Sequence, residues 1–503
     1  METIHTLVEK AANWFALPLV GVLLATSIFF TIRLRFVQIF RFRDAIRETI
    51  ASRQSGASGP LSPLQAFMTS LAATIGVGNI AGVATAIVAG GPGAMFWIWC
   101  YGFLAMPLKF AEASLGMHYR VAKGDEVLAG PMYYLRDGLK SPMLAWIYAL
   151  LAGMSVLFTT PFTQPNSVAD AVGSQLAQQG LSLGIWRVAG FNIKADHLVI
   201  GLVLCVLTWL VTVRGVKALG RAAEKLSPLK VGLYLIGGAV VIVTHITNLP
   251  EVLKLIFSQA FSARASLGAA AGLAIMAAMR YGVARGVYAN EAGYGTAAVA
   301  YGTAKSQRPE QQGLAAMTEV FIISFITSTI SGLSILLTGV WNAGGIRNLA
   351  APVQIVAETL PTYGGIATAT VLNGVGRTGS AVVAQAFNQP MPGLGGWMVA
   401  ISMFLFGYTV LIGWGYYGEQ FFEYLFGPRI IVPYRWFYAF LIPFGALFKV
   451  DLVWNWGDIV NGLQIFPNVI GLIALSGIAA AYANKSPSLS ALKSPSPSGR
   501  GPG

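Results

Sequence analysis

The run of residues 74–79 interrupts a long apolar segment with groups that could bind a small charged molecule. Its residues are Thr74, Ile75, Gly76, Val77, Gly78 and Asn79. Glycine lowers the cost of leaving helical geometry, and an asparagine amide both donates and accepts hydrogen bonds. Where a helix unwinds, the N–H groups that open the next half-helix favour an anion, and the freed carbonyl groups favour a cation. The run therefore predicts a site for a carboxylate and a cation, with close helix packing through Gly78 and Gly82 as the alternative.

A second apolar segment carries a similar interruption at residues 279–286. We expect the second break to lie within this run and to place Met279 beside the same bound molecule. Non-helical backbone at membrane depth is tolerated only where it lines a cavity inside the protein. Two interrupted segments in corresponding positions are the best sequence indication of the binding site of a secondary transporter.

The composition places these segments in a membrane. Apolar residues make up 55% of the chain and charged residues 11%, whereas a soluble chain carries roughly a quarter charged residues. A helix needs about 20 apolar residues to cross a bilayer. We therefore predict an all-α polytopic membrane protein with about 11 transmembrane helices. The expected spans lie near residues 11–32, 64–90, 93–117, 143–175, 197–213, 231–247, 267–300, 313–341, 396–426, 436–448 and 455–481.

The net charge of +13 indicates orientation rather than a nucleic-acid partner. Positive residues gather on the cytoplasmic side of membrane proteins. With the N-terminus outside, 22 of the 33 lysines and arginines fall in inner loops, Lys230 among them, and 8 fall in outer loops. We expect a bacterial inner-membrane protein with its N-terminus outside and its C-terminus in the cytoplasm.

The spans also suggest an internal symmetry. Residues 1–32 form an extra first helix, and the other ten spans divide into five within 64–247 and five within 248–481. Because five is odd, the two groups must have opposite orientations. Residues 33–63 form a basic cytoplasmic loop that begins as an amphipathic surface helix, and the Ser- and Pro-rich tail 482–503 is expected to be disordered.

The outer connection of residues 342–395 contains an apolar stretch at 366–372 that is too short to span a membrane. A span needs about 20 residues. We expect this stretch to form a re-entrant or surface helix, which could act as a lid over the binding site.

Several polar and charged residues lie within the expected spans and need partners there. Gln164 and Asn166 could contact the bound molecule or a neighbouring helix. Trp414 could wall the cavity and limit the size of its occupant, and core packing is the alternative. Lys109 and Glu112 stand at positions i and i+3 and can pair along one helix face. Because this pair lies near the cytoplasmic end, we expect a structural or gating role rather than substrate binding.

The chain resembles the alanine or glycine:cation symporter family in motifs that follow the family order from about residue 65 to 475. The motifs are GVGNIAG at 76–82, GGPGAMFWIW at 90–99, KFAE at 109–112, GPMYYL at 130–135, GVARG at 282–286, NEAG at 290–293, WGYYGE at 414–419, NGL at 461–463 and PN at 467–468. The resemblance implies a leucine-transporter-like fold, a 5+5 inverted repeat with two discontinuous helices. It also implies Na⁺-coupled uptake of alanine or glycine.

The resemblance further implies roles for single residues. It places Gln164 against the substrate and a sodium ligand at Thr409, which joins the Ile75 carbonyl and Asn79 in the expected cation site. The family usually has a Ser-Thr pair where this chain has Thr409 and Val410, so one hydroxyl is lost.

Two charged residues near the second interruption have an expected role of their own. The resemblance implies that Arg285 and Glu291 help to close the cytoplasmic side through ion pairs that separate on opening. An arginine near the site could instead attract a substrate carboxylate directly.

These expectations describe a secondary active transporter that brings a small neutral amino acid into the cell with Na⁺ by alternating access. No GxxxxGK[ST] loop and no HExxH motif occurs, which argues against an ATP-driven pump and a metalloprotease. A proton-coupled carrier, a carrier of different specificity, a channel and a transporter-like receptor are the alternatives. The expected partners are the amino acid, Na⁺ and the lipid bilayer, without an organic cofactor, and a monomer or an oligomer fits the sequence equally.

Overall fold

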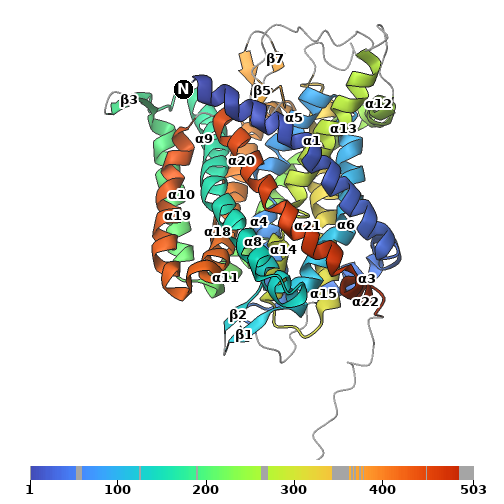
Figure 1. Ribbon diagram of the computed structural model, residues 1–503. Coiled ribbons are helices and arrows are strands. Elements are labelled where there is room, and N and C mark those ends of the chain that lie inside the picture. Colours follow the sequence, from blue (N-terminus) through green and yellow to red (C-terminus); the bar gives the residue numbers. More distant parts are fainter. Residues whose placement is uncertain are drawn as a thin grey trace, which may run out of the picture.

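The computed structural model describes residues 2–51, 59–123, 126–188, 191–261, 270–341, 379–448 and 450–485, and four short strands between 362 and 377. Helices make up most of this part of the chain and pack side by side in one bundle (Figure 1).

Three helices precede the first interrupted helix. They are α1 (Glu2–Arg33), α2 (Val37–Phe40) and α3 (Phe42–Ala51). α1 crosses the outside of the bundle, where it packs against α6 and α20 (Figure 1). Short helices are thus present where the basic loop was expected to begin. Some of their apolar side chains face outward, such as Phe40 at 77% and Ile50 at 79% exposed, whereas Val37 and Ala45 are buried. The rest of that loop, residues 52–58, lies outside the described residues.

The following part of the chain, up to residue 244, begins with a short helix that is capped by its own side chains. Ser62 accepts a hydrogen bond from the Gln65 N–H, and the Gln65 side chain accepts one from the Ser62 N–H, which is a capping box. The helices are α4 (Pro63–Thr74), η1 (Val77–Asn79), α5 (Ala81–Gly90), α6 (Ala94–His118), α7 (Pro131–Tyr133), η2 (Tyr134–Gly138), α8 (Pro142–Phe158), α9 (Thr160–Gln178), α10 (Ala195–Thr212) and α11 (Val216–Thr244). Two antiparallel hairpins connect some of them: β1 (Val121–Lys123) with β2 (Glu126–Leu128), and β3 (Ile185–Val188) with β4 (Phe191–Lys194).

The remaining part of the chain is also helical, with two more short hairpins. Its helices are η3 (Ile246–Asn248), α12 (Leu249–Phe261), α13 (Ala270–Asn290), α14 (Thr296–Gly302), α15 (Pro309–Phe321), η4 (Ile322–Thr327), α16 (Ser328–Thr338), α17 (Gly379–Asn388), α18 (Gly395–Phe426), η6 (Pro428–Ile430), α19 (Ile431–Leu447), α20 (Val450–Leu463), α21 (Ile465–Ala474) and α22 (Ser476–Ala483). The hairpins are β5 (Thr362–Tyr363) with β6 (Ile366–Ala367), and β7 (Thr370–Leu372) with β8 (Val375–Arg377).

The helices are long and apolar enough for a multi-pass membrane protein. Among the described residues, seven helical segments could cross a membrane, and nine could if each of two bent pairs counts as one span. The bent pairs are Pro63–Thr74 with Val77–Gly90, at 65°, and Ile459–Ala474 with Ser476–Ala483, at 64°. The expected number of eleven spans stays a prediction.

Two expectations about peripheral segments are wrong in part. Within the stretch 366–372, residues 366–367 form β6 and residues 370–372 form β7, rather than a helix. Its β-branched residues Ile366, Thr370 and Val371 favour extended backbone, which apolar character alone did not reveal. α22 reaches Ala483 and so enters the tail that was expected to be disordered, while residues 486–503 lie outside the described residues.

The interrupted helices face one another inside the bundle. α4 packs against α14, and α5 packs against α13. α18 packs against α4, α9 and α11. This arrangement brings the ends of four half-helices together with the middle of α18.

Candidate functional site

The first interrupted helix breaks where the sequence predicts. α4 ends at Thr74, the next two residues are extended, and the chain resumes as η1 and α5 at 65° to α4. The Asn79 N–H donates to the Gly76 carbonyl at 3.1 Å, and Asn79 Nδ2 donates to the Thr74 carbonyl at 3.4 Å. Of the first N–H groups of η1, that of Gly78 has no acceptor within the helix itself, and that of Val77 donates to Gln164 Oε1 at 3.4 Å. The break therefore presents donors on one side and carbonyl groups on the other.

Neighbouring side chains approach the unwound backbone directly. A methyl group at Gly78 would lie 2.6 Å from the Tyr288 ring on α13. A methyl group at Gly76 would lie 2.8 Å from Val410 on α18 and 3.1 Å from Gln164 Oε1 on α9. Both glycines are thus required by close contact.

The second break lies at residues 291–295, between α13 and α14, and not at 279–286 as predicted. Glu291, Gly293 and Gly295 have φ angles of 51°, 94° and 86°, in the left-handed region that favours glycine. α13 continues as a helix up to Asn290. The break is therefore later in the chain than the arginine- and glycine-rich run.

The glycines of the run 279–286 serve helix packing instead. A methyl group at Gly282 would overlap the backbone carbonyl of Ala94, and one at Gly286 would lie 2.9 Å from the Tyr101 ring. α13 can thus approach α6 closely along this stretch. A glycine that permits close packing and a glycine that permits unwinding look alike in the sequence.

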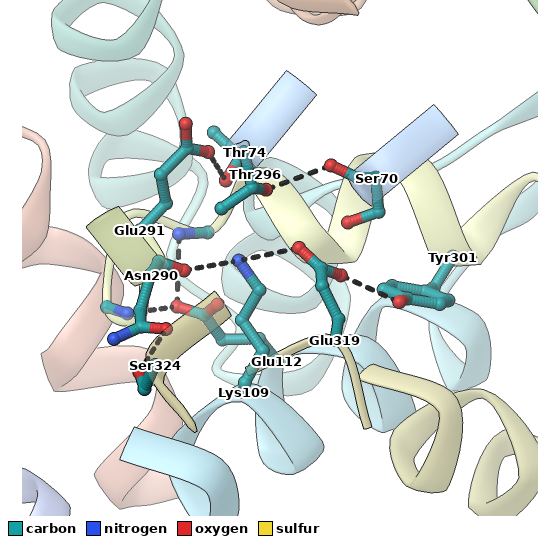
Figure 2. Close-up of polar contacts among 12 residues, drawn as sticks. Ser70, Thr74, Lys109, Glu112, Asn290, Glu291, Thr296, Tyr301, Glu319 and Ser324 are labelled. Atoms are coloured by element: carbon teal, nitrogen blue, oxygen red, sulfur yellow. Dashed lines mark hydrogen bonds and ion pairs between the residues drawn. The ribbon is translucent and has the colours of Figure 1, made fainter. Parts of the chain in front are cut away.

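Glu112 on α6 holds the second break in its unwound form. Its Oε1 accepts hydrogen bonds from the N–H groups of Gly293 at 2.8 Å and Gly295 at 3.0 Å (Figure 2). It also accepts one from Asn468 Nδ2 at 2.9 Å. Asn468 Nδ2 also donates to the Gly293 carbonyl at 2.7 Å. The carboxylate thus takes up N–H groups that precede α14, a position that a negative charge stabilises.

Lys109 does not pair with Glu112, contrary to the prediction from their i, i+3 spacing. Its Nζ lies 3.7 Å from Glu319 Oε1 and donates to the Asn290 carbonyl at 2.9 Å (Figure 2). Glu319 Oε2 accepts a hydrogen bond from the Tyr301 hydroxyl at 2.7 Å. The two residues of α6 therefore contact different neighbours. Lys109 contacts Glu319 on α15 and the carbonyl group at the end of α13, whereas Glu112 binds the loop between α13 and α14.

A cavity lies between the two breaks. Its volume is about 20 Å³, room for about one water molecule, so an amino acid fits only if the lining groups move apart. Its lining comes from α4, η1, α8 to α9, α13, the second break, α18 and α20. The lining residues are Ala73, Thr74, Gly76, Gly78, Asn79, Thr159, Thr160, Thr163, Gln164, Tyr288, Ala289, Glu291, Tyr294, Val410, Trp414 and Asn461.

Most residues that were expected to bind the substrate lie at this cavity. Six of them line it: Thr74, Gly76, Gly78, Asn79, Gln164 and Trp414. Val77 lies beside the lining, and its N–H donates to Gln164 Oε1 at 3.4 Å. Met279 is not part of the lining. It precedes the true second break by about three helical turns, so its expected place was wrong.

Glu291 and Trp414 meet at one wall of the cavity. Glu291 Oε1 accepts a hydrogen bond from the Trp414 indole at 2.9 Å, and Oε2 accepts one from Thr296 Oγ1 at 3.0 Å. The Trp414 ring also stands edge-on to Tyr294, with centroids 6.4 Å apart. Glu291 was expected to gate the cytoplasmic side, and the structure places its carboxyl group at the cavity itself.

Arg285 does not lie with Glu291 in the inner half of the second interrupted helix. Its Cδ would contact a methyl group on Gly82 of α5 at 3.4 Å, and its guanidinium lies 5.9 Å from the Tyr288 ring. It therefore belongs to the pair α5 and α13, on the other side of the breaks from α4 and α14. Arg285 precedes the second break and Glu291 lies in it, so the two residues do not share one half of the helix. Their expected role in closing the cytoplasmic side stays a prediction.

Several lining residues were not predicted. Thr159, Thr160 and Thr163 come from the junction of α8 and α9, and Asn461 comes from α20. Asn461 Oδ1 accepts a hydrogen bond from Thr159 Oγ1 at 3.3 Å. The cluster of three threonines just before Gln164 is unusual in an apolar span and could have drawn attention to this wall.

Asn166 serves helix packing. Its Nδ2 donates to the carbonyl groups of Gly445 at 3.2 Å and Phe448 at 2.8 Å, which end α19. Of the two roles that the sequence left open for Asn166, the structure shows contact with a neighbouring helix.

The residues of the expected cation site fall into two groups. The Ile75 carbonyl and Thr409 Oγ1 both accept hydrogen bonds from Lys230 Nζ, at 2.7 Å and 2.6 Å. Asn79 lines the cavity, and its buried Oδ1 accepts no hydrogen bond from the described residues. Lys230 was expected in an inner loop, but it lies inside α11, which begins 14 residues earlier, at Val216.

Comparison with known sequences identifies relatives along nearly the whole chain. The model of the sodium:alanine symporter family matches residues 1–488. The sodium/alanine symporter AgcS of Methanococcus maripaludis is 37% identical over 462 residues, which are 91% of this chain and 91% of that protein. The probable sodium/glutamine symporter GlnT of Bacillus subtilis is 31% identical over 461 residues, which are 92% of this chain and 86% of that protein.

Comparison with solved structures supports the fold. The crystal structure of MhsT in complex with L-phenylalanine matches with a TM-score of 0.58 at 12% identity, over 86% of this chain and 94% of that chain. The likeness confirms the predicted class, an all-α membrane protein of the leucine-transporter type.

Proposed function

The chain belongs to the sodium:alanine symporter family, and we propose that it transports a small neutral amino acid, such as alanine or glycine, into the cell together with Na⁺. Proteins of this family are amino acid symporters and not enzymes. The observation that carries the proposal is the cavity between two broken helices, because it combines hydrogen-bond donors, oxygen atoms and a small enclosed volume at one place.

The two ends of an amino acid find complementary groups in this cavity. The N–H groups at the start of η1, with the dipole of the helix that follows, suit the carboxylate. The Glu291 carboxyl group, which lines the same cavity, suits the ammonium. Charge-assisted hydrogen bonds of this kind are roughly twice as strong as neutral ones. A zwitterion is therefore a better occupant than an uncharged molecule of the same size.

The walls around this pair of groups favour a small side chain. Val410, Trp414, Tyr288 and Tyr294 line the cavity, and the backbone at Gly76 and Gly78 has no room for a methyl group. A bulky substrate would have to displace packed aromatic rings. This geometry supports alanine or glycine over larger amino acids.

Na⁺ completes the proposed mechanism. Asn79 Oδ1 is an oxygen atom at the cavity without a donor among the described residues, and it lies beside the proposed carboxylate position, so one ion could contact both. One charge that crosses 100 mV gains about 2.3 kcal/mol, and a tenfold Na⁺ gradient adds about 1.4 kcal/mol. Together these terms support accumulation on the order of several hundredfold.

The proposal is tested by uptake of labelled alanine and glycine into proteoliposomes, with Na⁺ and pH gradients imposed separately. We expect an inward Na⁺ gradient to drive accumulation and saturating unlabelled alanine to prevent it. Accumulation driven by the pH gradient alone would contradict Na⁺ coupling. Binding without uptake would contradict transport altogether, and stronger competition by glutamine than by alanine would contradict the proposed substrate size.

A further inference from the structure

Lys230 is a buried cation at the end of the first half of the broken helix. It lies in the middle of α11 and is 0% exposed. Its Nζ donates to the carbonyl oxygens of Ala72 at 3.1 Å and Ile75 at 2.7 Å, and to Thr409 Oγ1 at 2.6 Å. The last turn of α4, the middle of α11 and the middle of α18 thus meet around one ammonium group.

Oxygen dipoles, not a counterion, stabilise this charge. An ammonium group has three N–H donors and no acceptor, and three oxygen atoms surround Nζ. In the part of the chain that the structure describes, no carboxylate lies within ion-pair distance of Lys230. The ring of Phe406 lies 5.2 Å from Nζ, within cation–π range. The C-terminal carbonyl groups of α4 also carry the negative end of its helix dipole.

Two of the three oxygen atoms belong to the site that the sequence predicts for Na⁺, namely those of Ile75 and Thr409. Na⁺ and a lysine ammonium carry the same charge, and the same oxygen dipoles attract both. Only one of them can occupy the space, because Nζ already lies within hydrogen-bond distance of every oxygen in the cluster. We propose that Lys230 is a tethered cation that takes the place of Na⁺ between α4 and α18.

A tethered cation has a definite consequence for ion coupling. The inference rests on the proposed function, since it assigns one of the cation positions of that carrier. Lys230 holds α4 against α18 without an ion from solution, so this position adds no Na⁺ to the transport cycle. A coupling ion would instead bind at the Asn79 end of the break, away from Ile75 and Thr409.

The test measures binding of labelled L-alanine to the purified full-length protein, in sodium chloride or in choline chloride of the same concentration. In the wild-type background, Thr409→Val should leave the ratio of the two affinities unchanged, because Na⁺ does not use this hydroxyl group. Lys230→Ala removes charge-assisted hydrogen bonds, and it should weaken binding in choline chloride by about tenfold or more. Na⁺ should restore part of this loss by entering the emptied oxygen cluster, and the double variant Lys230→Ala/Thr409→Val should lose the restoration.

Lys225→Met is the matched control, since Lys225 lies on the same helix but is exposed; its binding in both salts should equal that of the wild type. The proposal is wrong if Thr409→Val abolishes a Na⁺ dependence that the wild type shows. It is equally wrong if Lys230→Ala binds L-alanine in choline chloride as the wild type does. The Thr409→Val comparison decides the matter even where Lys230→Ala does not fold.

A second readout separates this inference from the proposed function. If neither alanine nor glycine binds to any form of the protein, the proposed function fails. Thermal unfolding without an amino acid then tests Lys230 alone. A rise of Tm in Na⁺ that appears in Lys230→Ala and not in the wild type supports the tethered cation, whereas equal responses of the two proteins contradict it.

Discussion

Removal of the Lys109 charge should destabilise the protein strongly, because it leaves a buried carboxylate without its cation. Lys109 and Glu319 are both 0% exposed, with Nζ 3.7 Å from Oε1, and Oε1 accepts no hydrogen bond from the described residues. At this distance and an effective dielectric constant of about 20, the attraction amounts to about 4 kcal/mol. Breaking a buried pair from one side costs about 3–5 kcal/mol, so Lys109→Met should lower the free energy of unfolding by this amount.

A double-mutant cycle shows whether the pair is the cause. Glu319→Gln removes the second charge and keeps an acceptor for the Tyr301 hydroxyl. Lys109→Met/Glu319→Gln should therefore lose less than the sum of the two single variants, by about 1–3 kcal/mol. Unfolding in mixed micelles of a nonionic detergent and sodium dodecyl sulfate provides the free energies. Lys217→Met, which changes an exposed lysine of α11, should stay within about 0.5 kcal/mol of the wild type.

The reasoning is refuted if Lys109→Met unfolds like the Lys217→Met control, or if the effects of Lys109→Met and Glu319→Gln simply add. Either result would mean that the ion pair contributes nothing beyond its separate side chains. Uptake of labelled alanine, measured on the same variants, shows whether the pair also serves the transport cycle.

Three further substitutions test the site. Gly78→Ala places a methyl group 2.6 Å from the Tyr288 ring, so it should weaken L-alanine binding, measured by calorimetry, by about tenfold or more; unchanged affinity would contradict the close approach. Trp414→Phe removes the indole N–H that donates to Glu291. The loss should reduce the free energy of substrate binding or of unfolding by about 1.5–3 kcal/mol; unchanged uptake and unchanged Tm would contradict this. Asn166→Ala should lower Tm and leave the Kd for L-alanine unchanged, since its amide nitrogen donates to carbonyl groups at the end of α19; a raised Kd with unchanged Tm would contradict a packing role.

The first break could be predicted because several signals coincide within six residues. The run contains two glycines and an asparagine within an otherwise apolar segment. Few structures other than an unwound helix beside a cavity are compatible with this combination. The structure adds what the sequence does not contain, namely that Tyr288, Val410 and Gln164 approach the unwound backbone. These contacts depend on how distant helices pack.

The second break was misplaced because glycine has two uses in membrane helices. Gly282 and Gly286 permit close packing against α6, whereas Gly293 and Gly295 adopt positive φ angles. The stabilising partner of the true break is Glu112, which lies 181 residues before Gly293. No local pattern around the break indicates such a partner.

Lys230 was misplaced for a related reason. A serine, a proline and two lysines lie within residues 225–230, a composition typical of a loop. In the structure Pro228 lies inside α11, as membrane helices tolerate when neighbouring groups satisfy the freed backbone. The buried lysine is stabilised by the carbonyl groups of Ala72 and Ile75. These groups can accept its hydrogen bonds because α4 ends there and leaves them without partners inside the helix.

The proposed function depends most on the two breaks, which would hold the amino acid between them. A structure of the protein with bound L-alanine, determined by cryo-electron microscopy, tests this claim directly. We expect the carboxylate next to the N–H groups of Val77 and Gly78, and the ammonium on the side of Glu291. L-alanine bound outside the cavity, or bound in it with its ends reversed, would contradict the account.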